Sequence, residues 1–142
     1  MRALQIVIDT NVVVSALRSI RGASYRLFTL LGSGRFEINI SVPLVLEYEE
    51  VCKRSLGLIP LTPADIDDVV NFLCRLANRH TVFYHWRPFL NDPEDDMVLE
   101  LAVAAGCDAI VTYNRRDFRG VDRFGIRVLT PSEFLREIGE LP

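Results

Sequence analysis

Short apolar runs alternate along the chain with longer stretches in which apolar residues recur at helical spacing. The apolar runs predict strands at residues 4–8, 36–40, 81–84, 109–112 and 126–129. The helical spacing predicts helices at 11–18, 23–32, 42–55, 63–79, 93–105 and 131–139, with a short turn or helix at 114–118. Strands that alternate with helices are typical of a parallel sheet covered on both faces. We therefore predict an α/β fold with three layers, α/β/α, around a mostly parallel five-stranded sheet.

The composition is that of an ordinary globular protein. The chain has 142 residues, of which 49% are hydrophobic and 25% charged, and this length favours a single domain spanning residues 1–142. No apolar run is long enough to span a membrane and the first residues lack a signal-peptide pattern, so we expect a cytoplasmic protein. The net charge of −3 argues against a large basic surface for nucleic acid but leaves room for a local one.

The most hydrophobic predicted strand ends in a carboxylate. In the stretch LQIVIDTNVVVSAL, Asp9 directly follows the apolar run that ends at Ile8. A buried charge without a partner is costly, so Asp9 must either cap the next helix or bind a cation. Ligands of open parallel sheets bind beyond the carboxyl ends of the strands, and Asp9 lies at such an end.

Further acids lie near predicted strand ends or on partly apolar helices. In the stretch SVPLVLEYEEV, Glu47 and Glu49 both flank the apolar stripe, and the helical wheel does not choose between them. In NDPEDDMVLELAVAAG, Asp92 and Asp96 are four residues apart and share one helical face. In VTYNRRDF, Asp117 follows the fourth predicted strand.

Each of these acids also has an ordinary structural interpretation. Asp92 is best explained as the N-cap of its helix, and Glu94 and Asp95 as acids of the first helical turn. Considered alone, Glu47 is a flanking charge, and Asp117 could form a surface ion pair with a neighbouring arginine.

The acids gain meaning if they converge. The first and fourth strands of parallel α/β sheets are commonly neighbours, which would bring Asp9, Asp96 and Asp117 to one edge. Glu47 would reach in from its helix. Carboxylates without histidine or cysteine form a hard-oxygen site, which suits Mg²⁺ or Mn²⁺. Such an ion bridges to phosphate oxygens and lowers the pKa of an attacking water.

Other phosphate chemistries fit the sequence less well. Phosphatases that form an aspartyl phosphate want a second aspartate two residues on from the nucleophile, where this chain has Asn11. They also want a lysine after a late strand, but the only lysine, Lys53, lies in a predicted helix. The sequence has no GxxxxGK[ST] phosphate-binding loop.

With these residues in view, the chain resembles the PIN domain nucleases. More narrowly, it is similar to the bacterial and archaeal proteins of that family described as toxin components of toxin–antitoxin pairs (VapC-like). The likeness runs in order through VIDTNVVVSAL, SVPLVLEYEEV, DPEDDMVLELAVAAGCDAIVTYNRRDF and GIRVLTPSEFL, and it covers essentially the whole chain. It implies that the predicted sheet is PIN-like, and hence Rossmann-like.

The resemblance also implies site residues. Those that match the catalytic acids are Asp9, Glu47, Asp96 and Asp117, and the match selects Glu47 over Glu49. Asp9, Asp96 and Asp117 would hold the metal ion. The residues that match supporting positions are Asn11, Asn114 and Asp92. The arginines that could contact RNA are Arg115, Arg116 and Arg119 near the site, and Arg18, Arg21 and Arg26 beyond the first strand.

The activity implied by the resemblance is Mg²⁺- or Mn²⁺-dependent hydrolysis of RNA phosphodiesters, which leaves 5′-phosphate and 3′-hydroxyl ends. Family behaviour also implies a homodimer and a small antitoxin protein that blocks the site. Two other interpretations stay open at this point. One is an RNA-processing or DNA-cleaving nuclease of the same fold. The other is a non-catalytic module that binds RNA or protein and whose acids are helix caps.

Overall fold

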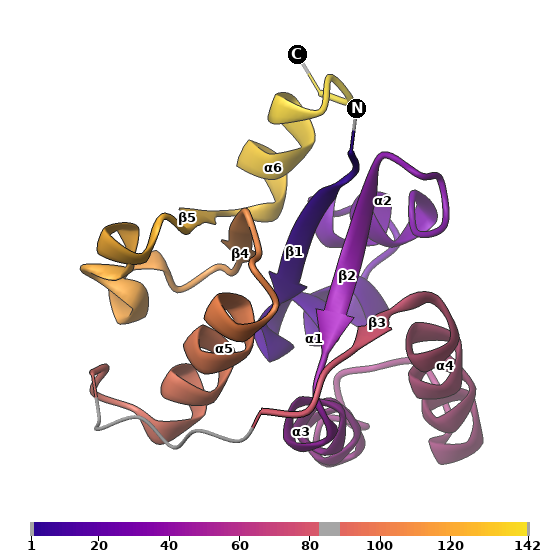
Figure 1. The fold of residues 1–142 in the computed structure, drawn as a ribbon. Helices are drawn as coiled ribbons and strands as arrows, with labels where there is room; N and C mark the ends of the chain where they lie inside the picture. The colour runs from indigo at the N-terminus through magenta and orange to yellow at the C-terminus, as the bar shows by residue number, and fades with distance from the viewer. Residues whose placement is uncertain (1, 83–88, 142) are drawn as a thin grey trace.

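Five parallel strands form the centre of the molecule in the computed structural model, which describes residues 2–82 and 89–141 (Figure 1). The strands are β1 (Leu4–Ile8), β2 (Phe36–Ile40), β3 (Asn78–Arg79), β4 (Ala109–Val111) and β5 (Arg127–Leu129). Their order across the sheet is β3-β2-β1-β4-β5, and each neighbouring pair is parallel. The prediction of a parallel five-stranded sheet is therefore confirmed.

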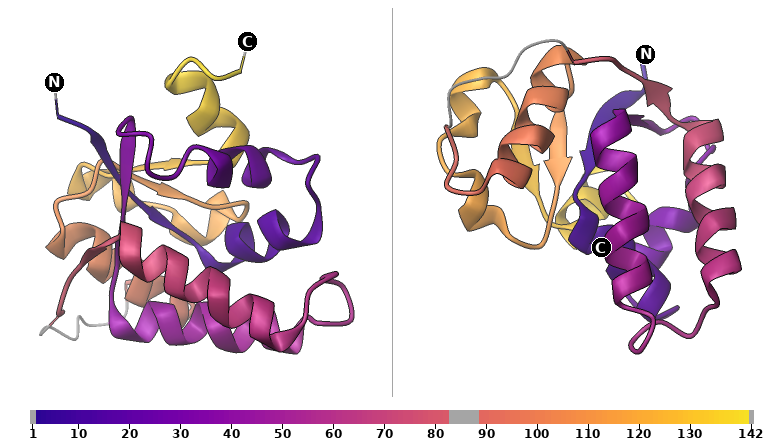
Figure 2. Two further views of the ribbon diagram at one scale, coloured as in Figure 1. Left: turned by 90° about the vertical axis from the view of Figure 1, so that its right-hand side faces the viewer. Right: turned by 90° about the horizontal axis from the view of Figure 1, so that it is seen from below.

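Helices cover both faces of this sheet. They are α1 (Thr10–Arg18), α2 (Ala23–Thr29), α3 (Val42–Arg54), α4 (Pro63–Leu76), α5 (Pro93–Ala104) and α6 (Pro131–Glu137), with short 3-10 helices η1 (Arg115–Phe118) and η2 (Val121–Phe124). Figure 2 shows α5 on one side of the sheet and α1, α2 and α6 on the other, while α3 and α4 run alongside each other. The predicted three-layer α/β/α arrangement is confirmed. No helix within residues 2–82 and 89–141 is both long and apolar enough to cross a membrane.

Local sequence signals set the helix boundaries. Thr62 and Thr130 each form a reciprocal capping box with the acid three residues on, and a proline follows each at the first helical position. Gly106 has a φ of 63°, a left-handed conformation that favours glycine, and it follows the end of α5.

The third strand differs from the sequence prediction. It lies at Asn78–Arg79, within the end of the predicted helix 63–79. The predicted strand at 81–84 is wrong for Thr81 and Val82, which are not in a strand, and its other two residues lie outside the described part of the chain.

Polar contacts explain this difference. The Asn78 side chain donates hydrogen bonds to Gln5 Oε1 at 3.0 Å and to Glu37 Oε1 at 3.2 Å, across β2 to β1. The backbone N–H of His80 donates to Ile40 O at 2.9 Å. An edge strand held by amide side chains has no apolar run, so the hydrophobic pattern could not reveal it.

The strand order fixes where a site can form. β1 is the central strand. The strands of the first half of the chain, β2 and β3, lie on one side of it, and β4 and β5 lie on the other. Strand order therefore reverses at β1, and a crevice is expected beyond the carboxyl ends of β1 and β4. The strand residues that lead to that point, Ile6 to Ile8 and Ala109 to Val111, are all buried. The carboxyl ends of β1 and β4 therefore emerge from the packed core.

Candidate active site

Asp9 stands at the carboxyl end of β1 and is only 8% exposed. Its Oδ1 accepts a hydrogen bond from Thr10 N at 2.8 Å, so it is the N-cap of α1. Its Oδ2 accepts from Thr112 Oγ1 at 2.8 Å and from Asn11 Nδ2 at 3.4 Å. Burial raises the pKa of Asp9 above 3.8, and the nearby charges of other acids raise it further, although the hydrogen bonds from Thr112 and Thr10 lower it. Asp9 thus caps a helix, and its ionised form is disfavoured by burial and by neighbouring acids, so a cation would stabilise it.

Thr112 connects the ends of β1 and β4. It follows β4, is 0% exposed, and donates its hydroxyl to Asp9. The same hydroxyl oxygen accepts from Asn11 Nδ2 at 3.2 Å and from Asn114 N at 3.0 Å. Asn11 Oδ1 in turn accepts from Tyr113 N at 3.3 Å. Asn11 therefore holds both the Asp9 carboxylate and the chain after β4. Sequence reasoning missed Thr112, although its place directly after a buried strand was a usable signal.

We expect Thr112→Val to destabilise the protein and to weaken any activity that depends on Asp9. The valine keeps the volume but removes the hydroxyl from a buried carboxylate, at a cost of about 1–3 kcal/mol. The pKa of Asp9 should rise further, because the Thr112 hydrogen bond lowers it. Urea unfolding measures the first effect. The matched control is Thr29→Val, where an exposed hydroxyl donates only to the backbone carbonyl of Arg26. Equal losses in both variants would contradict this role of Thr112.

Glu47 reaches the same edge from α3. Thr10 Oγ1 donates a hydrogen bond to its Oε2, which ties it to the first residue of α1. The pKa of Glu47 is raised from 4.5 to about 7: burial is the main cause, a hydrogen bond and charge from Glu94 add to it, and the Thr10 hydrogen bond opposes it. Glu49 instead forms an ion pair with Lys53 at 3.0 Å. The structure thus brings Glu47, and not Glu49, toward Asp9.

Two consecutive aspartates in the first turn of α5 have different surroundings. Asp96 is 8% exposed, and its Oδ1 accepts hydrogen bonds from Phe89 N at 3.2 Å and Leu90 N at 2.9 Å. It is therefore committed to the backbone that precedes the helix. Asp95 is half-buried, and burial first and then the charges of Asp9 and other site acids raise its pKa from 3.8 to about 7. Of these two aspartates, Asp95 is therefore the one whose charge interacts with that of Asp9.

A signal for Asp95 was present in the sequence. On the helical wheel it continues through Val98, Leu99 and Ala102, and all of these are buried, at 1%, 0% and 0% exposure. The face that continues from Asp96 shares Leu99 but then passes through Glu100 and Val103, which are only half-buried. The face that continues from Asp95 is therefore the more apolar of the two, which is a weak signal in favour of Asp95.

Three more acids surround this point. Asp92 is the N-cap of α5, since its Oδ1 accepts from Glu94 N at 2.9 Å, and its charge acts on both Asp9 and Asp95. Asp117 is exposed on η1 and its charge acts on the same two carboxyls. We call the set the acidic cluster; its members are Asp9, Glu47, Asp92, Glu94, Asp95 and Asp117. Asn114 N and O hold the turn before Asp117 through Thr112 Oγ1 and Asp117 N.

The donor chemistry of the acidic cluster suits a hard divalent cation. Its members are all carboxylates, and the described side chains that hydrogen-bond to them include the hydroxyls of Thr10 and Thr112 and the amide of Asn11. The raised pKa values of Asp9, Glu47 and Asp95 reflect burial first and then repulsion from other acids. Within residues 2–82 and 89–141, no three His, Cys, Asp or Glu side chains are already close enough to hold a metal ion.

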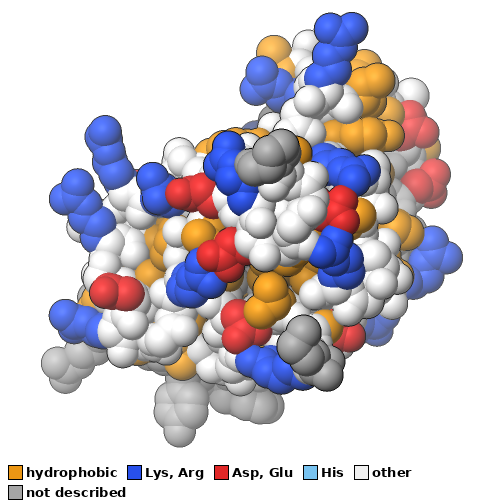
Figure 3. Space-filling model, turned by 90° about the horizontal axis from the view of Figure 1, so that it is seen from above, with side chains coloured by type: hydrophobic (Ala, Val, Ile, Leu, Met, Phe, Trp, Pro, Cys, Tyr) orange, Lys and Arg blue, Asp and Glu red, His pale blue; other side chains and the backbone are white. Residues whose placement is uncertain are grey.

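The arginines predicted to contact RNA have different surroundings. Arg115 forms an ion pair with Glu133 at 3.2 Å, whereas Arg116 and Arg119 are exposed. Arg26 is engaged with Glu140 at 2.6 Å. A hollow of about 500 Å³ lies directly beside the acidic cluster, lined by Tyr113, Asn114, Arg115, Arg116 and Asp117. On the face seen in Figure 3, basic and acidic side chains are instead interspersed.

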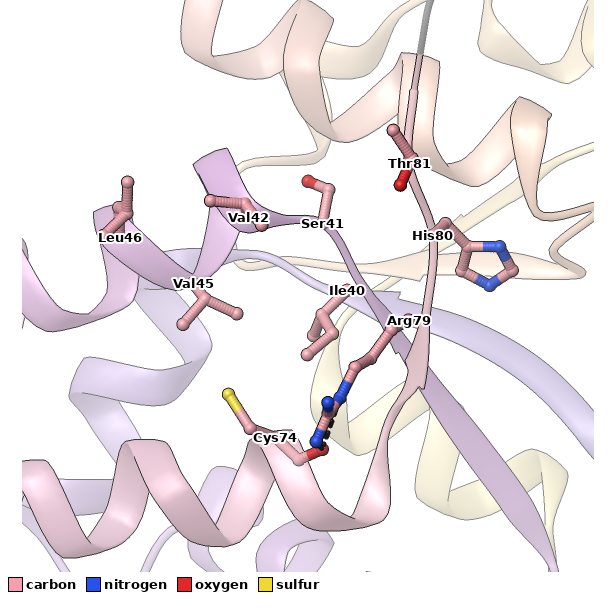
Figure 4. A pocket seen from close by; sticks show the side chains of 9 residues that line it. All are labelled: Ile40, Ser41, Val42, Val45, Leu46, Cys74, Arg79, His80 and Thr81. Carbon is pink, nitrogen blue, oxygen red and sulfur yellow. Dashed lines mark hydrogen bonds between the residues drawn. The ribbon is translucent and has the colours of Figure 1, made fainter.

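A second hollow, of about 460 Å³, lies between β3 and the start of α3 (Figure 4). It is mostly apolar, and Val42 and Leu46 at its margin are 71% and 58% exposed. Its one guanidinium, from Arg79, donates hydrogen bonds to the Cys74 carbonyl oxygen. The hollow contains no carboxylate, so it is not part of the candidate site.

Comparison with protein families gives one match. A model of the PIN domain family matches residues 5–116. The matched span includes all of β1 but its first residue, as well as α3, α5 and β4, and it ends one residue before Asp117. A search of curated proteins found no match.

Proposed function

The chain belongs to the PIN domain family, which indicates a nuclease, and from that premise we propose that it is a ribonuclease dependent on Mg²⁺ or Mn²⁺. The observation that carries the proposal is the acidic cluster at the switch point of the sheet. Acids that follow β1 or lie on α3, α5 and η1 interact there through their charges, and burial and repulsion raise the pKa of Asp9, Glu47 and Asp95. A protein gains little from such an arrangement unless it binds a cation.

We assign the cation to Asp9, Asp95 and Asp117, because the charges of these residues act on one another. Asp96, which the sequence resemblance implied, stays the alternative to Asp95. When bound, a divalent ion supplies a Lewis acid that polarises the phosphodiester and lowers the pKa of the attacking water.

The residues around the ligands have supporting roles in this proposal. Asn11 and Thr112 hold the Asp9 carboxylate in one orientation. Glu47 has a pKa of about 7, raised first by burial, so near neutral pH it can take or return a proton at its carboxylate. Asp92 keeps the first turn of α5 in place through its hydrogen bond to Glu94 N.

Three finer features rest on the sequence resemblance. RNA as the substrate, a role as the toxin of a toxin–antitoxin pair, and a homodimer blocked by a small antitoxin protein all follow from likeness to that subgroup. The exposed arginines beside the acidic cluster support a polyanionic substrate. We propose these three features as separate statements, because each can fail without the others.

The proposal predicts that purified protein cuts single-stranded RNA only when Mg²⁺ or Mn²⁺ is added. Products should carry 5′-phosphate and 3′-hydroxyl ends, and DNA of the same sequence should be cut less. Asp9→Asn should be inactive, whereas Glu50→Gln is the control, because Glu50 is exposed on α3 and pairs with Arg54. Cleavage that persists in chelator or in Asp9→Asn would contradict the assignment.

The toxin role has its own readout in a bacterial host. Expression of the wild-type chain should stop growth, and Asp9→Asn should not. Growth that continues despite proven RNA cleavage would leave the nuclease in place and remove the toxin role.

A further inference from the structure

Tyr113 is an exposed aromatic residue held in a fixed position beside the acidic cluster. It directly follows Thr112, is 44% exposed, and lines the same hollow as Asp117. Its hydroxyl is hydrogen-bonded to Ser24 Oγ at 2.5 Å and accepts from Ser15 Oγ at 3.4 Å. Ser24 is 0% exposed, so the hydroxyl end of the side chain is anchored at α2. The exposed surface of the side chain therefore includes its ring.

An anchored ring of this kind is suited to stacking. Stacking on a nucleobase needs an aromatic face that is open to solvent and that loses little freedom on binding. The backbone of Tyr113 is fixed as well, because its N–H donates to Asn11 Oδ1 at 3.3 Å. A base can reach such a ring only if it is unstacked from its neighbours, which holds for single strands and not for a duplex.

The remaining walls of the hollow supply groups for the nucleotide backbone. Arg116 is exposed and lines the hollow. Arg115 also lines it, but its guanidinium is engaged with Glu133. Arg116 is therefore the cation that can turn to a phosphate without breaking an ion pair seen here. Asp117 lies between this hollow and the rest of the acidic cluster.

We propose that this hollow binds one nucleotide of single-stranded RNA next to the scissile phosphate, with its base stacked on Tyr113 and its phosphate on Arg116. The inference rests on the nuclease function proposed above and adds the two residues, Tyr113 and Arg116, that hold the nucleotide. It makes Tyr113 a substrate-binding residue and leaves the chemistry to the acidic cluster.

To test this inference, the binding of RNA is measured separately from its cleavage. The probe is a short single-stranded RNA that contains 2-aminopurine, bound to Asp95→Asn protein in Mg²⁺, with single-stranded DNA and duplex RNA as further arms. Stacking should quench the 2-aminopurine fluorescence. In this background, Tyr113→Leu should bind roughly 5- to 150-fold more weakly and lose the quenching. Tyr113→Phe keeps the ring and should retain both. Duplex RNA should bind weakly and independently of Tyr113.

Two matched controls isolate the hollow. Tyr25→Leu removes a tyrosine of α2 that is 39% exposed but does not line the hollow, and should leave binding unchanged. Arg116→Ala should weaken binding and lower the slope of log affinity against log salt by about 0.7, as for one phosphate contact to a single strand. Arg75→Ala, an exposed arginine on α4, should change neither.

Distinct results would overturn the inference. If Tyr113→Phe loses both binding and quenching as Tyr113→Leu does, an aromatic ring at this position is not sufficient, and stacking on the ring does not account for binding. If Tyr113→Leu binds and quenches like its parent while wild-type protein cuts RNA, the inference fails and the nuclease stands. If single-stranded DNA shows the same dependence on Tyr113, stacking holds and the restriction to RNA is wrong. If wild-type protein does not cut RNA but Asp95→Asn still binds it through Tyr113, the nuclease fails and the binding site stands.

Discussion

Asp95→Asn is expected to abolish metal-dependent RNA cleavage, with a loss of at least roughly 100-fold, and to leave the fold intact. Asp95 is the acid of the α5 turn whose carboxyl interacts with Asp9 and Asp117. The asparagine keeps the size of the side chain but cannot supply the charge that holds a divalent cation. Its neutral amide also removes repulsion from the acidic cluster, so the free energy of unfolding should stay the same or rise at neutral pH.

Asp96→Asn is expected to give the opposite pattern. Asp96 is buried and accepts two backbone hydrogen bonds, from Phe89 N and Leu90 N. A neutral amide accepts these bonds more weakly and must turn its NH₂ group away from them, at a cost of about 1–3 kcal/mol. Protein that remains folded should still bind the cation and cut RNA.

The pair forms a crossed experiment within one helical turn. Cleavage rates are measured on protein shown by circular dichroism to be folded, and urea unfolding gives the stability of each variant. A result in which Asp96→Asn loses all cleavage with unchanged stability, while Asp95→Asn stays active, would assign the metal to Asp96. Loss of cleavage in both, each with full stability, would mean that the two acids share the site.

Most of the fold could be predicted from the sequence because its strongest signals are local. β1 and β4 carry short apolar runs, β2 alternates apolar and polar residues, and the capping residues Thr62 and Thr130 set helix starts. The edge strand β3 could not be found this way. It consists of Asn78 and Arg79 and is held by polar contacts to residues far away in the sequence.

The candidate site was harder to predict because it depends on which direction each side chain points around its helix. The strand end marked Asp9, since a carboxylate after a buried run needs a partner whatever the fold. Glu47 and Glu49 lie on either flank of one apolar stripe, so the wheel could not separate them, and only the packing of α3 against α1 shows which one meets Thr10. In α5 the apolar residues lie on two faces, and the choice between Asp95 and Asp96 depended on which face meets the sheet.

The stability of the metal-free protein is expected to fall as the pH rises from about 4 to above about 7. Burial, and then the charges of other acids, raise the pKa of Asp95 from 3.8 to about 7. Burial likewise raises the pKa of Glu47 from 4.5 to about 7. Below the unfolded pKa values both carboxyls are protonated in either state, and the native state pays no penalty. Above about 7 both are ionised, and the folded state then carries buried, mutually repelling charges that the unfolded chain does not.

Mg²⁺ or Mn²⁺ should reverse this trend, because a cation binds the ionised carboxylates and neutralises their repulsion. We expect either ion to raise the thermal midpoint by a few degrees at about pH 8 and by much less at about pH 5. Cleavage should vanish in chelator at every pH, and the apparent affinity for the ion should rise with pH up to about 7. Thermal unfolding with and without chelator, across this range, measures the stability effect directly.

Asp95→Asn separates the contribution of the acidic cluster to this pH dependence from that of the other titrating groups. Because it removes one of the groups with a raised pKa, its metal-free stability should fall less steeply with pH than that of wild type. Its midpoint should also respond less to the cation at about pH 8. Glu50→Gln removes an exposed acid of α3 and should behave like wild type on both counts. An equal response to the cation at both pH values, or in Asp95→Asn and wild type alike, would show that the ion binds away from the acidic cluster. The acids would then serve the fold as caps and helix-end charges.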